Sequence, residues 1–348
     1  MVAVWNEACL RHAPGAEFWL GLRMPDDELP ERAVIIRDAV VAAGARIVPA
    51  EPHADDALLA VHDPGLVAFL RDAYADWEAA GLPVDPGQGL VVPYLFPTPG
   101  MLGGAEAHVP AAVWARTGFW CFDTMTPIGA GTWEAARGAV DAALTAVDLV
   151  RAGEPLAYAI TRPPGHHVSR SAYGGSCYLN NAAVAAHALG GRVAIVDIDA
   201  HHGNGAQEIF RGRDDVLTAS VHVDPAAGWF PHVMGWPGEG GAANLNAVVA
   251  PGSGDEEWLA ALDTALAAVR GFGPDAMVLA LGVDAAVDDP NSPLGVTVGG
   301  LREAGRRIGA SGLPIVAVQE GGYHPATLGG LVVAVLEGIE EGRDGRGA

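Results

Sequence analysis

The sequence predicts one α/β domain in which a mostly parallel sheet carries helices on both faces. From Gly131 onwards, short apolar segments alternate with segments that have the period of a helix, and this alternation is typical of a parallel sheet with helical crossovers. Half of the 348 residues are hydrophobic, and glycine and proline are scattered through the chain, as in a globular protein. No change in composition marks a second domain, although the length alone would allow one.

The elements can be assigned in order along the chain. Pro30 opens a helix that ends near Gly44, a strand follows at 46–48, and a second helix covers about 64–80. The segment 81–131 contains seven prolines and no sustained period, so we expect a long loop insertion there. The acidic, glycine-rich end at 340–348 is expected to fray. Further strands are expected at 157–161, 193–198, 216–221, 276–281 and 315–318, with helices at 181–189, 256–269 and 301–310.

The charge of the chain restricts its partners. There are 20 basic residues, all of them arginine, against 42 acidic ones, which gives a net charge of −22. Such a chain cannot replace the counterions of nucleic acid, so we expect no nucleic-acid partner. It attracts cationic ligands instead. We expect no membrane span and no leader segment, and three widely spaced cysteines indicate a reduced, cytoplasmic protein.

Polar side chains follow four of the predicted strands, at the sheet edge where ligands of α/β proteins bind. The motif R-P-P-G-H-H (162–167) follows the first of these strands, and D-I-D-A-H-H-G-N-G (197–205) ends the second. The sequences G-V-D (282–284) and E-G-G-Y (320–323) follow the other two. Imidazoles, carboxylates and a phenol therefore meet at the edge where a site is expected.

The second of these motifs indicates a metal centre. Asp197, Asp199 and His201 alternate along extended backbone, so their side chains share one face. Carboxylates and an imidazole placed together need a compensating cation, and oxygen and nitrogen ligands without thiolate suit Zn²⁺, Fe²⁺, Mn²⁺ or Co²⁺. A catalytic site keeps three protein ligands and one open position. Asp199 and His201 supply two ligands, and Asp284 from another strand end can supply the third.

The charge of this ligand set implies a separate general base. Two carboxylates nearly neutralise a divalent ion, which then acidifies water less than a three-histidine centre does. His166 and His167 are the candidates, since the rigid Pro163-Pro164-Gly165 turn precedes them. Tyr323 can donate a hydrogen bond to a substrate carbonyl and to the oxyanion that develops from it.

Taken together, the motifs resemble those of the arginase–deacetylase superfamily and, within it, the zinc-dependent histone deacetylase family. The greatest similarity is to the bacterial, class II-like acetylpolyamine amidohydrolases. The segments G-G-S-C-Y-L-N-N-A-A (174–183), L-L-A-V-H-D-P-G (58–65) and G-T-W-E-A-A (131–136) also match, so the resemblance spans most of residues 1–348. It implies a single open three-layer α/β domain with a mostly parallel sheet of about eight strands.

The resemblance also implies roles for individual residues. It makes Asp199, His201 and Asp284 the ligands of one Zn²⁺, and Tyr323 the residue that polarises the scissile carbonyl. His166 and His167 would form a tandem pair oriented by Asp197 and Asn204. Because a neutral amide raises the pKa of an imidazole less than a carboxylate does, we expect His167 to be neutral and act as the base. A structural K⁺ is implied near Asp197, Asp199, His201 and Ser220.

The substrate cavity departs from the family pattern. Family members place an aromatic residue where Ser176 stands, so one wall of the acyl tunnel is opened here, while Phe230 is expected to keep the other. Gly175 and Gly322 are further expected tunnel residues. Trp114 and Met125 occupy the positions where related polyamine deacetylases carry acidic entrance residues, with Asp123 and Glu106 nearby. The motifs therefore predict amide hydrolysis, whereas they do not identify the amine part of the substrate.

These observations predict a zinc-dependent amidohydrolase that hydrolyses an N-acyl amine, such as an acetylated polyamine, a related small amine or acyl-lysine. Alternatives are a deacylase of a natural product or another bulky amide, an arginase-like ureohydrolase with two Mn²⁺ ions, and an inactive module that binds acyl-amines. By resemblance, we expect a homodimer formed through the segment 81–131.

Overall fold

The computed structural model describes residues 1–81 and 89–345. Its centre is an eight-stranded sheet with the order β4-β1-β5-β10-β9-β6-β7-β8, and every neighbouring pair is parallel. The predicted fold class is therefore confirmed. The strands are β1 (Val2–Trp5), β4 (Arg46–Pro49), β5 (Leu156–Ala159), β6 (Val193–Asp197), β7 (Val216–Val223), β8 (Asn244–Val249), β9 (Ala276–Leu281) and β10 (Ile315–Gln319).

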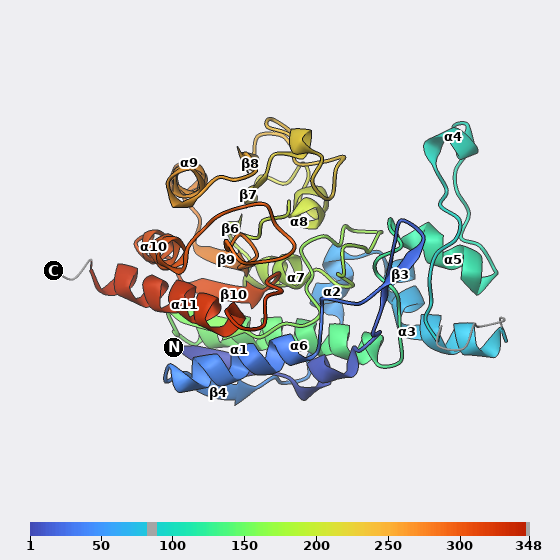
Figure 1. The fold of residues 1–348 in the computed structure, drawn as a ribbon, viewed down its shortest axis with the longest axis horizontal. Helices are drawn as coiled ribbons and strands as arrows, with labels where there is room; N and C mark the ends of the chain where they lie inside the picture. The colour runs from blue at the N-terminus through green and yellow to red at the C-terminus, as the bar shows by residue number, and fades with distance from the viewer. Residues whose placement is uncertain (82–88, 346–348) are drawn as a thin grey trace.

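Helices cover both faces of the sheet and make three layers (Figure 1). Because alternate strand residues face opposite sides, Ala194 and Val196 of β6 enter one hydrophobic core, whereas Val193 and Ile195 enter the other. The first core is covered by α1 (Glu31–Ala42), α9 (Asp255–Phe272), α10 (Val298–Gly309) and α11 (Leu328–Asp344). The second is covered by α2 (Asp56–Val61), α3 (Pro64–Ala79), α6 (Thr132–Arg151), α7 (Asn181–Leu189) and α8 (Asn204–Ile209).

Strands β1 and β8 and a small hairpin are absent from the sequence prediction. The hairpin pairs β2 (Glu17–Trp19) with β3 (Leu22–Met24) in antiparallel register. Its two-residue turn places both Leu20 and Gly21 at positive φ, which matches the right-handed twist of the paired strands. Leucine is unusual at such a position. Only Gly21 therefore matches the residue pattern that is typical of this turn, and the hairpin was not predicted.

The segment 81–131 was expected to be a loop, and this expectation is wrong in part. It contains α4 (Pro99–Leu102) and α5 (Val113–Trp120), which stand away from the sheet at the right of Figure 1. Thr98 caps α4 by accepting the backbone N–H of Met101, and the apolar residues of α5 pack against α3. The prolines at 83 and 86 lie outside the described residues.

The expected fraying from residue 340 is also wrong over the described part of the tail. Helix α11 continues to Asp344 because it is held by α10. Arg302 forms ion pairs with Glu337 and Glu341, and a Cβ at Gly342 would lie 2.0 Å from the Arg306 carbonyl. Such close packing needs glycine. Residues 346–348 lie outside the described part. In residues 1–81 and 89–345, none of the helices is both long and apolar enough to cross a membrane.

Candidate active site

Three side chains from two adjacent strand ends form a compact cluster. Asp199 and His201 follow β6, and Asp284 follows β9, its neighbour in the sheet. The His201 Nδ1 lies 3.0 Å from Asp199 Oδ1 and 2.9 Å from Asp284 Oδ2. Each residue offers one ligand atom, and these atoms lie within 4.8 Å of one another. The structure therefore brings together the three residues predicted to bind a metal.

Two glycines allow this cluster to close. A Cβ at Gly282 would lie 2.1 Å from Asp199 Oδ2, and one at Gly321 would lie 2.6 Å from Asp284 Oδ2. The Gly321 N–H donates to Asp199 Oδ2 at 2.8 Å, and the Ala200 N–H donates to Asp284 Oδ1 at 2.7 Å. The His201 N–H donates to the other Asp199 oxygen, Oδ1, at 2.9 Å. Backbone N–H groups thus satisfy both oxygens of Asp199 and one oxygen of Asp284.

The cluster needs a cation to compensate its charge. Asp199 and Asp284 are fully buried. Burial and the neighbouring Asp199 charge raise the pKa of Asp284 to about 7, which is the expected response of a carboxyl that shares a dry site with another. Two carboxylates and one imidazole around a single point suit Zn²⁺ or a similar divalent ion. The donor set therefore fits the predicted metal.

The two histidines beside this cluster have different partners. His166 Nδ1 donates to Asp197 Oδ2 at 2.9 Å, and His167 Nδ1 donates to Asn204 Oδ1 at 2.7 Å. The Asn204 Nδ2 donates to the His167 carbonyl at 3.0 Å, which fixes the amide orientation. Because each Nδ1 carries the proton, each Nε2 is left to act on a substrate or a water molecule.

The electrostatic surroundings of His166 and His167 also differ, and they favour a charged ring only in His166. Although burial opposes a charged ring, the carboxylates of Asp199 and Asp197 raise the pKa of His166 well above its usual value. Burial and the charges of His166 and His201 hold the pKa of His167 well below its usual value. This arrangement favours a cationic His166 and a neutral His167.

A buried glutamate connects this histidine pair with the Tyr323 turn. The Glu320 Oε2 accepts the N–H groups of Gly165 and His166, at 2.7 and 3.1 Å. Burial raises the pKa of Glu320 to about 7. Glu320 was not predicted to have a role of its own, since its position in E-G-G-Y does not reveal contacts with residues more than 150 positions away.

The turn that carries Tyr323 is held on both sides. Arg32 donates from Nε to the Gly322 carbonyl at 2.6 Å and from Nη2 to the Glu320 carbonyl at 2.8 Å. Its guanidinium lies 4.6 Å from the centroid of the Tyr323 ring. The Asp289 Oδ2 accepts the Tyr323 N–H at 2.6 Å. Buried surroundings raise the pKa of Tyr323 well above its usual value, so the hydroxyl stays protonated.

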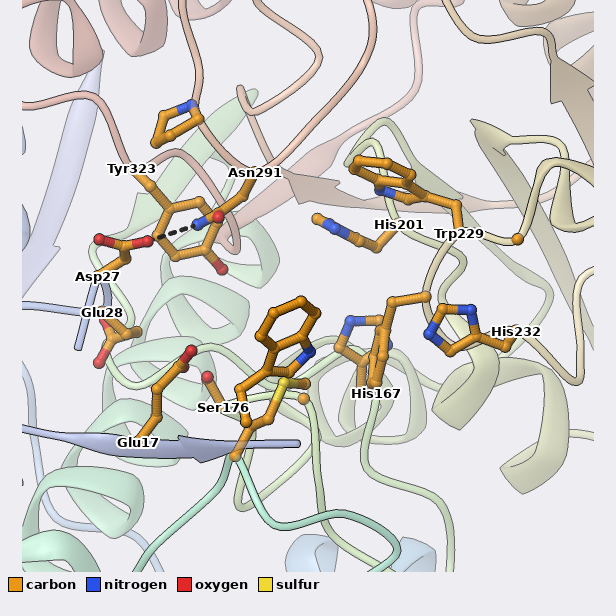
Figure 2. Close-up of a pocket in the computed structure, with 16 residues that line it drawn as sticks. Glu17, Asp27, Glu28, His167, Ser176, His201, Trp229, His232, Asn291 and Tyr323 are labelled. Atoms are coloured by element: carbon orange, nitrogen blue, oxygen red, sulfur yellow. Dashed lines mark hydrogen bonds between the residues drawn. The ribbon is translucent and has the colours of Figure 1, made fainter. Parts of the chain in front are cut away.

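One cavity of about 530 Å³ opens beside these groups, and its lining includes His167, His201 and Tyr323 (Figure 2). Phe230 forms one wall, with its ring centroid 4.9 Å from that of His167. Gly175 and Ser176 line the cavity as predicted. Further lining residues are Trp19, Met125, Trp229, His232, Pro290 and Asn291.

Gly322 does not line this cavity, so its predicted role as a wall residue is wrong. Its carbonyl is turned towards Arg32, and its Cα faces Val283 and Leu328, as the position of an added Cβ shows. Trp114 and Glu106 also lie outside the lining. Asp123 accepts the backbone N–H groups of residues 125, 126 and 175 and so serves the loop structure.

Acidic residues of the cavity come from the N-terminal segment, which sequence reasoning did not select. Glu17, Asp27 and Glu28 line the cavity and lie on one side of it in Figure 2, near Tyr323. Burial, together with the charges of Asp26, Asp27 and Asp123, raises the pKa of Glu17 to about 7. The short acidic segment at 26–28 was the only sequence feature that could have indicated these residues, but such a segment is also typical of a solvated surface.

The residues expected to hold K⁺ lie on β6, on β7 and in the segment that follows β6. Asp197 and Ser220 are register partners on β6 and β7. The Ser220 Oγ lies 2.8 Å from His222 Nδ1, and a Cβ at Gly203 would lie 2.3 Å from Asp197 Oδ2. The structure thus brings Asp197 and Ser220 close together beside the Asp199–His201 segment.

Comparison with known proteins gives a consistent result. A family model described as the histone deacetylase domain matches residues 27–339. The acetylpolyamine amidohydrolase 1 of Pseudomonas aeruginosa is 39% identical, over 98% of this chain and 99% of its own. The acetylpolyamine amidohydrolase of Burkholderia pseudomallei is 41% identical, over 91% of this chain and 92% of its own.

A solved structure shares the fold over nearly the full length. The crystal structure of an acetylpolyamine aminohydrolase from Burkholderia pseudomallei superposes with a TM-score of 0.91 at 37% identity, and the match covers 98% of this chain and 99% of that one. The match of the family model and the coverage of these relatives agree with the geometry of the cluster. The chain therefore belongs to the histone deacetylase family.

Proposed function

We propose that this protein is a Zn²⁺-dependent amidohydrolase that removes the acetyl group from an N-acetylated amine carrying a second, positively charged amino group, as acetylated polyamines do. One observation carries the proposal. A single cavity is lined both by His167, His201 and Tyr323 and by the carboxylates of residues 17, 27 and 28. The relatives named above as acetylpolyamine amidohydrolases support the same substrate class.

Asp199, His201 and Asp284 would hold the zinc ion. When bound there, Zn²⁺ supplies Lewis-acid polarisation of the acyl carbonyl and makes a nearby water more acidic. The nearly neutral centre that two carboxylates produce leaves proton removal to a protein base. Since the cluster closes only with glycine at positions 282 and 321, these glycines belong to the metal-binding machinery.

The histidines move the protons. His167 accepts a proton from the attacking water at Nε2, because Asn204 occupies its Nδ1–H. His166, held by Asp197, delivers a proton to the departing amine. Tyr323 donates a hydrogen bond to the acyl oxygen, and this bond strengthens as negative charge develops on that oxygen.

The carboxylates would select the amine. Glu17 is costly to ionise among its acidic neighbours, so an ammonium group beside it would be attracted strongly. Asp27 carries a second charge to the same side of the cavity, where its Oδ2 lies 3.5 Å from the Asn291 amide. The net charge of −22 adds long-range attraction of a cationic substrate.

We further propose a structural K⁺ beside Asp197, Asp199, His201 and Ser220, a cytoplasmic location and a homodimer. The three cysteines are free and buried, as suits a reducing compartment. The projecting segment that includes α4 and α5 exposes Tyr94, Met101, Val109 and Trp114, and these apolar side chains would be covered in a dimer.

A binuclear, arginase-like centre has less support. Within the described residues, the other group of three potential ligands is His166, Cys177 and Glu320, which shares no member with the first cluster. Two bridged metal ions require common ligands. A metal analysis that finds two tightly bound ions per chain would reverse this judgement.

The function is tested with purified, zinc-loaded protein on matched amides: acetylputrescine, acetylspermidine, an acetyl-lysine peptide and neutral N-acetylbutylamine. We expect hydrolysis of the acetylated polyamines with the highest kcat/KM. The Glu17→Gln variant should raise KM for acetylputrescine and leave N-acetylbutylamine unaffected. Absence of hydrolysis with zinc bound would contradict the enzymatic proposal. Equal activity on acetylputrescine and N-acetylbutylamine would contradict the proposed cation recognition.

A further inference from the structure

One part of the cavity wall is built from three segments that are distant in sequence. Trp19 ends strand β2, Met125 lies in the loop before α6, and Ser176 follows Gly175 in the loop before α7. All three line the same cavity as Phe230. We call Trp19, Met125 and Ser176 the variable wall.

Hydrogen bonds join the backbones of these segments. Thr124 Oγ1 donates to the Phe18 carbonyl at 2.5 Å, which links the hairpin to the loop of Met125. From the same loop, Asp123 Oδ2 accepts the Gly175 N–H at 2.6 Å and Thr126 Oγ1 accepts the Ser176 N–H at 2.9 Å. The three segments therefore form one connected unit, and their side chains reach the cavity from a fixed backbone.

The two walls differ in their side chains. The Phe230 ring packs against aromatic rings of Phe122, His167 and His232, with centroids 6.3, 4.9 and 6.0 Å away. The Trp19 ring makes no aromatic contact within residues 1–81 and 89–345, and Trp19 is 51% exposed. The Phe230 ring thus has aromatic neighbours on several sides, whereas about half of the Trp19 side chain faces solvent.

The other two side chains of the variable wall leave space. Ser176 presents only a hydroxymethyl group, and its φ of +59° is a left-handed conformation that bulky residues rarely adopt. Methionine is unbranched and adapts to irregular shapes. A cavity of about 530 Å³ falls within the roughly 300–1,000 Å³ range of sites that accept drug-sized ligands. This is more room than a slender alkyl chain needs.

We propose that the variable wall makes this enzyme accept acylated amines with a ring next to the amide, and that Trp19 and Ser176 determine this specificity. The inference rests on the proposed amidohydrolase function and extends it to a substrate class. The ring would lie between Phe230 and the Trp19 indole, in the space beside Ser176. Strand β2 then places Glu17 and Trp19 on the same face, two residues apart, so one strand would contact both the ring and the distal ammonium group.

The test uses two substrates of equal charge and similar length. Monoacetylated hexamethylenediamine has a slender chain, and monoacetylated para-xylylenediamine has a benzene ring between the two amino groups. For the wild-type enzyme, we expect kcat/KM for the ring-bearing amide to equal or exceed that for the slender one. If the slender amide is hydrolysed and the ring-bearing one is excluded, the inference is overturned while the proposed function stands.

Variants of the variable wall test whether its side chains cause the preference for the ring-bearing amide. Ser176→Phe fills the space beside Phe230 and should lower the ratio of ring-bearing to slender kcat/KM at least about tenfold. Ser176→Ala keeps the small side chain at the same φ and should leave the ratio unchanged. Trp19→Ala should raise KM for the ring-bearing amide roughly two- to tenfold by removing an aromatic contact. Leu20→Ala, at a 78% exposed neighbour outside the lining, is its control.

Calorimetry separates the two proposals. On the Tyr323→Phe background, binding of both amides is measured without turnover. We expect the ring-bearing amide to bind more tightly than the slender one, and Ser176→Phe to abolish this difference. That result would support the wall inference even if the wild-type enzyme hydrolysed neither amide. Equal effects of Ser176→Phe on both amides would overturn it.

Discussion

The carboxylate of Asp289 accepts the backbone N–H of Tyr323 at 2.6 Å. Its other oxygen accepts the N–H of Asn291 at 3.0 Å, and Asn291 lines the cavity. Asp289 is buried and therefore connects the loop after β9 with the turn that follows β10. The position of the Tyr323 hydroxyl depends on this connection.

Replacing Asp289 by alanine should lower kcat roughly 10- to 100-fold with little change in KM, since a buried N–H loses its acceptor and the turn relaxes. Asp289→Asn keeps an acceptor oxygen and should retain most activity. On a Tyr323→Phe background, Asp289→Ala should add almost nothing, because the group that it positions is gone. Additive losses in this double-mutant cycle would disprove the positioning role, and Asp288→Ala, at an exposed neighbour, is the control.

The Asn204 amide should set the pH at which His167 acts. In Asn204→Asp, a carboxylate faces His167 Nδ1 and favours the protonated ring. The acid limb of kcat/KM should therefore move to higher pH, by about one unit or more. Asn204→Ala removes the orientation and should lower kcat without that displacement. An unchanged acid limb in Asn204→Asp would argue against His167 as the base, and Asn244→Asp, outside the cavity lining, is the control.

Removal of the metal should destabilise the fold at neutral pH, because Asp199 and Asp284 are buried side by side. Titration of the chelated protein with Zn²⁺ should raise Tm, with a stabilisation of about 4 kcal/mol when free zinc exceeds Kd a thousandfold. His201→Ala should abolish this zinc-dependent shift. An exposed-site variant, Asp214→Asn, should retain it, and a Tm insensitive to zinc would refute the assigned site.

Acid should destabilise the protein partly through His62. This buried ring donates from Nδ1 to the Ser169 carbonyl and accepts the Asn180 N–H at Nε2, so it is held neutral. Burial lowers its pKa from 6.5 to about 4. Because the unfolded chain takes up the proton first, this contribution to stability is fully present above pH 6.5 and is lost as the pH falls towards 4. The loss amounts to about 3 kcal/mol.

Urea unfolding between pH 7 and 4.5 measures this effect. The wild-type free energy of unfolding should fall more steeply with acid than that of His62→Gln. His108→Gln, at an exposed position, should keep the wild-type slope. Parallel curves for wild type and His62→Gln would show that another group causes the acid sensitivity.

The sequence predicted those parts of the molecule that local pattern determines. Apolar strands such as β6 and β9 differ from helices in length and period, and polar residues at their ends must meet at one edge of a parallel sheet. Asp199, His201 and Asp284 could therefore be selected before any coordinates. Strand β8 begins Asn244-Leu245-Asn246, and this polar pattern does not read as a buried strand.

The contacts that shape the cavity were not predictable in this way. Glu17 and Glu28 reach the site from a segment that lacks any chemical motif, and Asp289 acts on a backbone N–H 34 positions away. Such contacts depend on how the loops cross the edge of the sheet, and the period of apolar residues in the sequence does not reveal the path of a loop. The small side chain of Ser176 predicted open space in the cavity wall. That Trp19 and Met125 line the same cavity could be seen only in the folded structure.

Glu28 sets a boundary for redesign of the amine preference. Its Oε1 pairs with Arg32 Nη1 at 2.5 Å and with Arg162 Nε at 2.9 Å, so one carboxylate is shared by two buried guanidinium groups from separate parts of the chain. Neutralising Glu28 would remove the carboxylate partner of both guanidinium groups in the interior. Engineering of a new amine selectivity should therefore begin at Glu17 or Asp27, where a change of charge leaves the ion pairs of Arg32 and Arg162 with Glu28 intact.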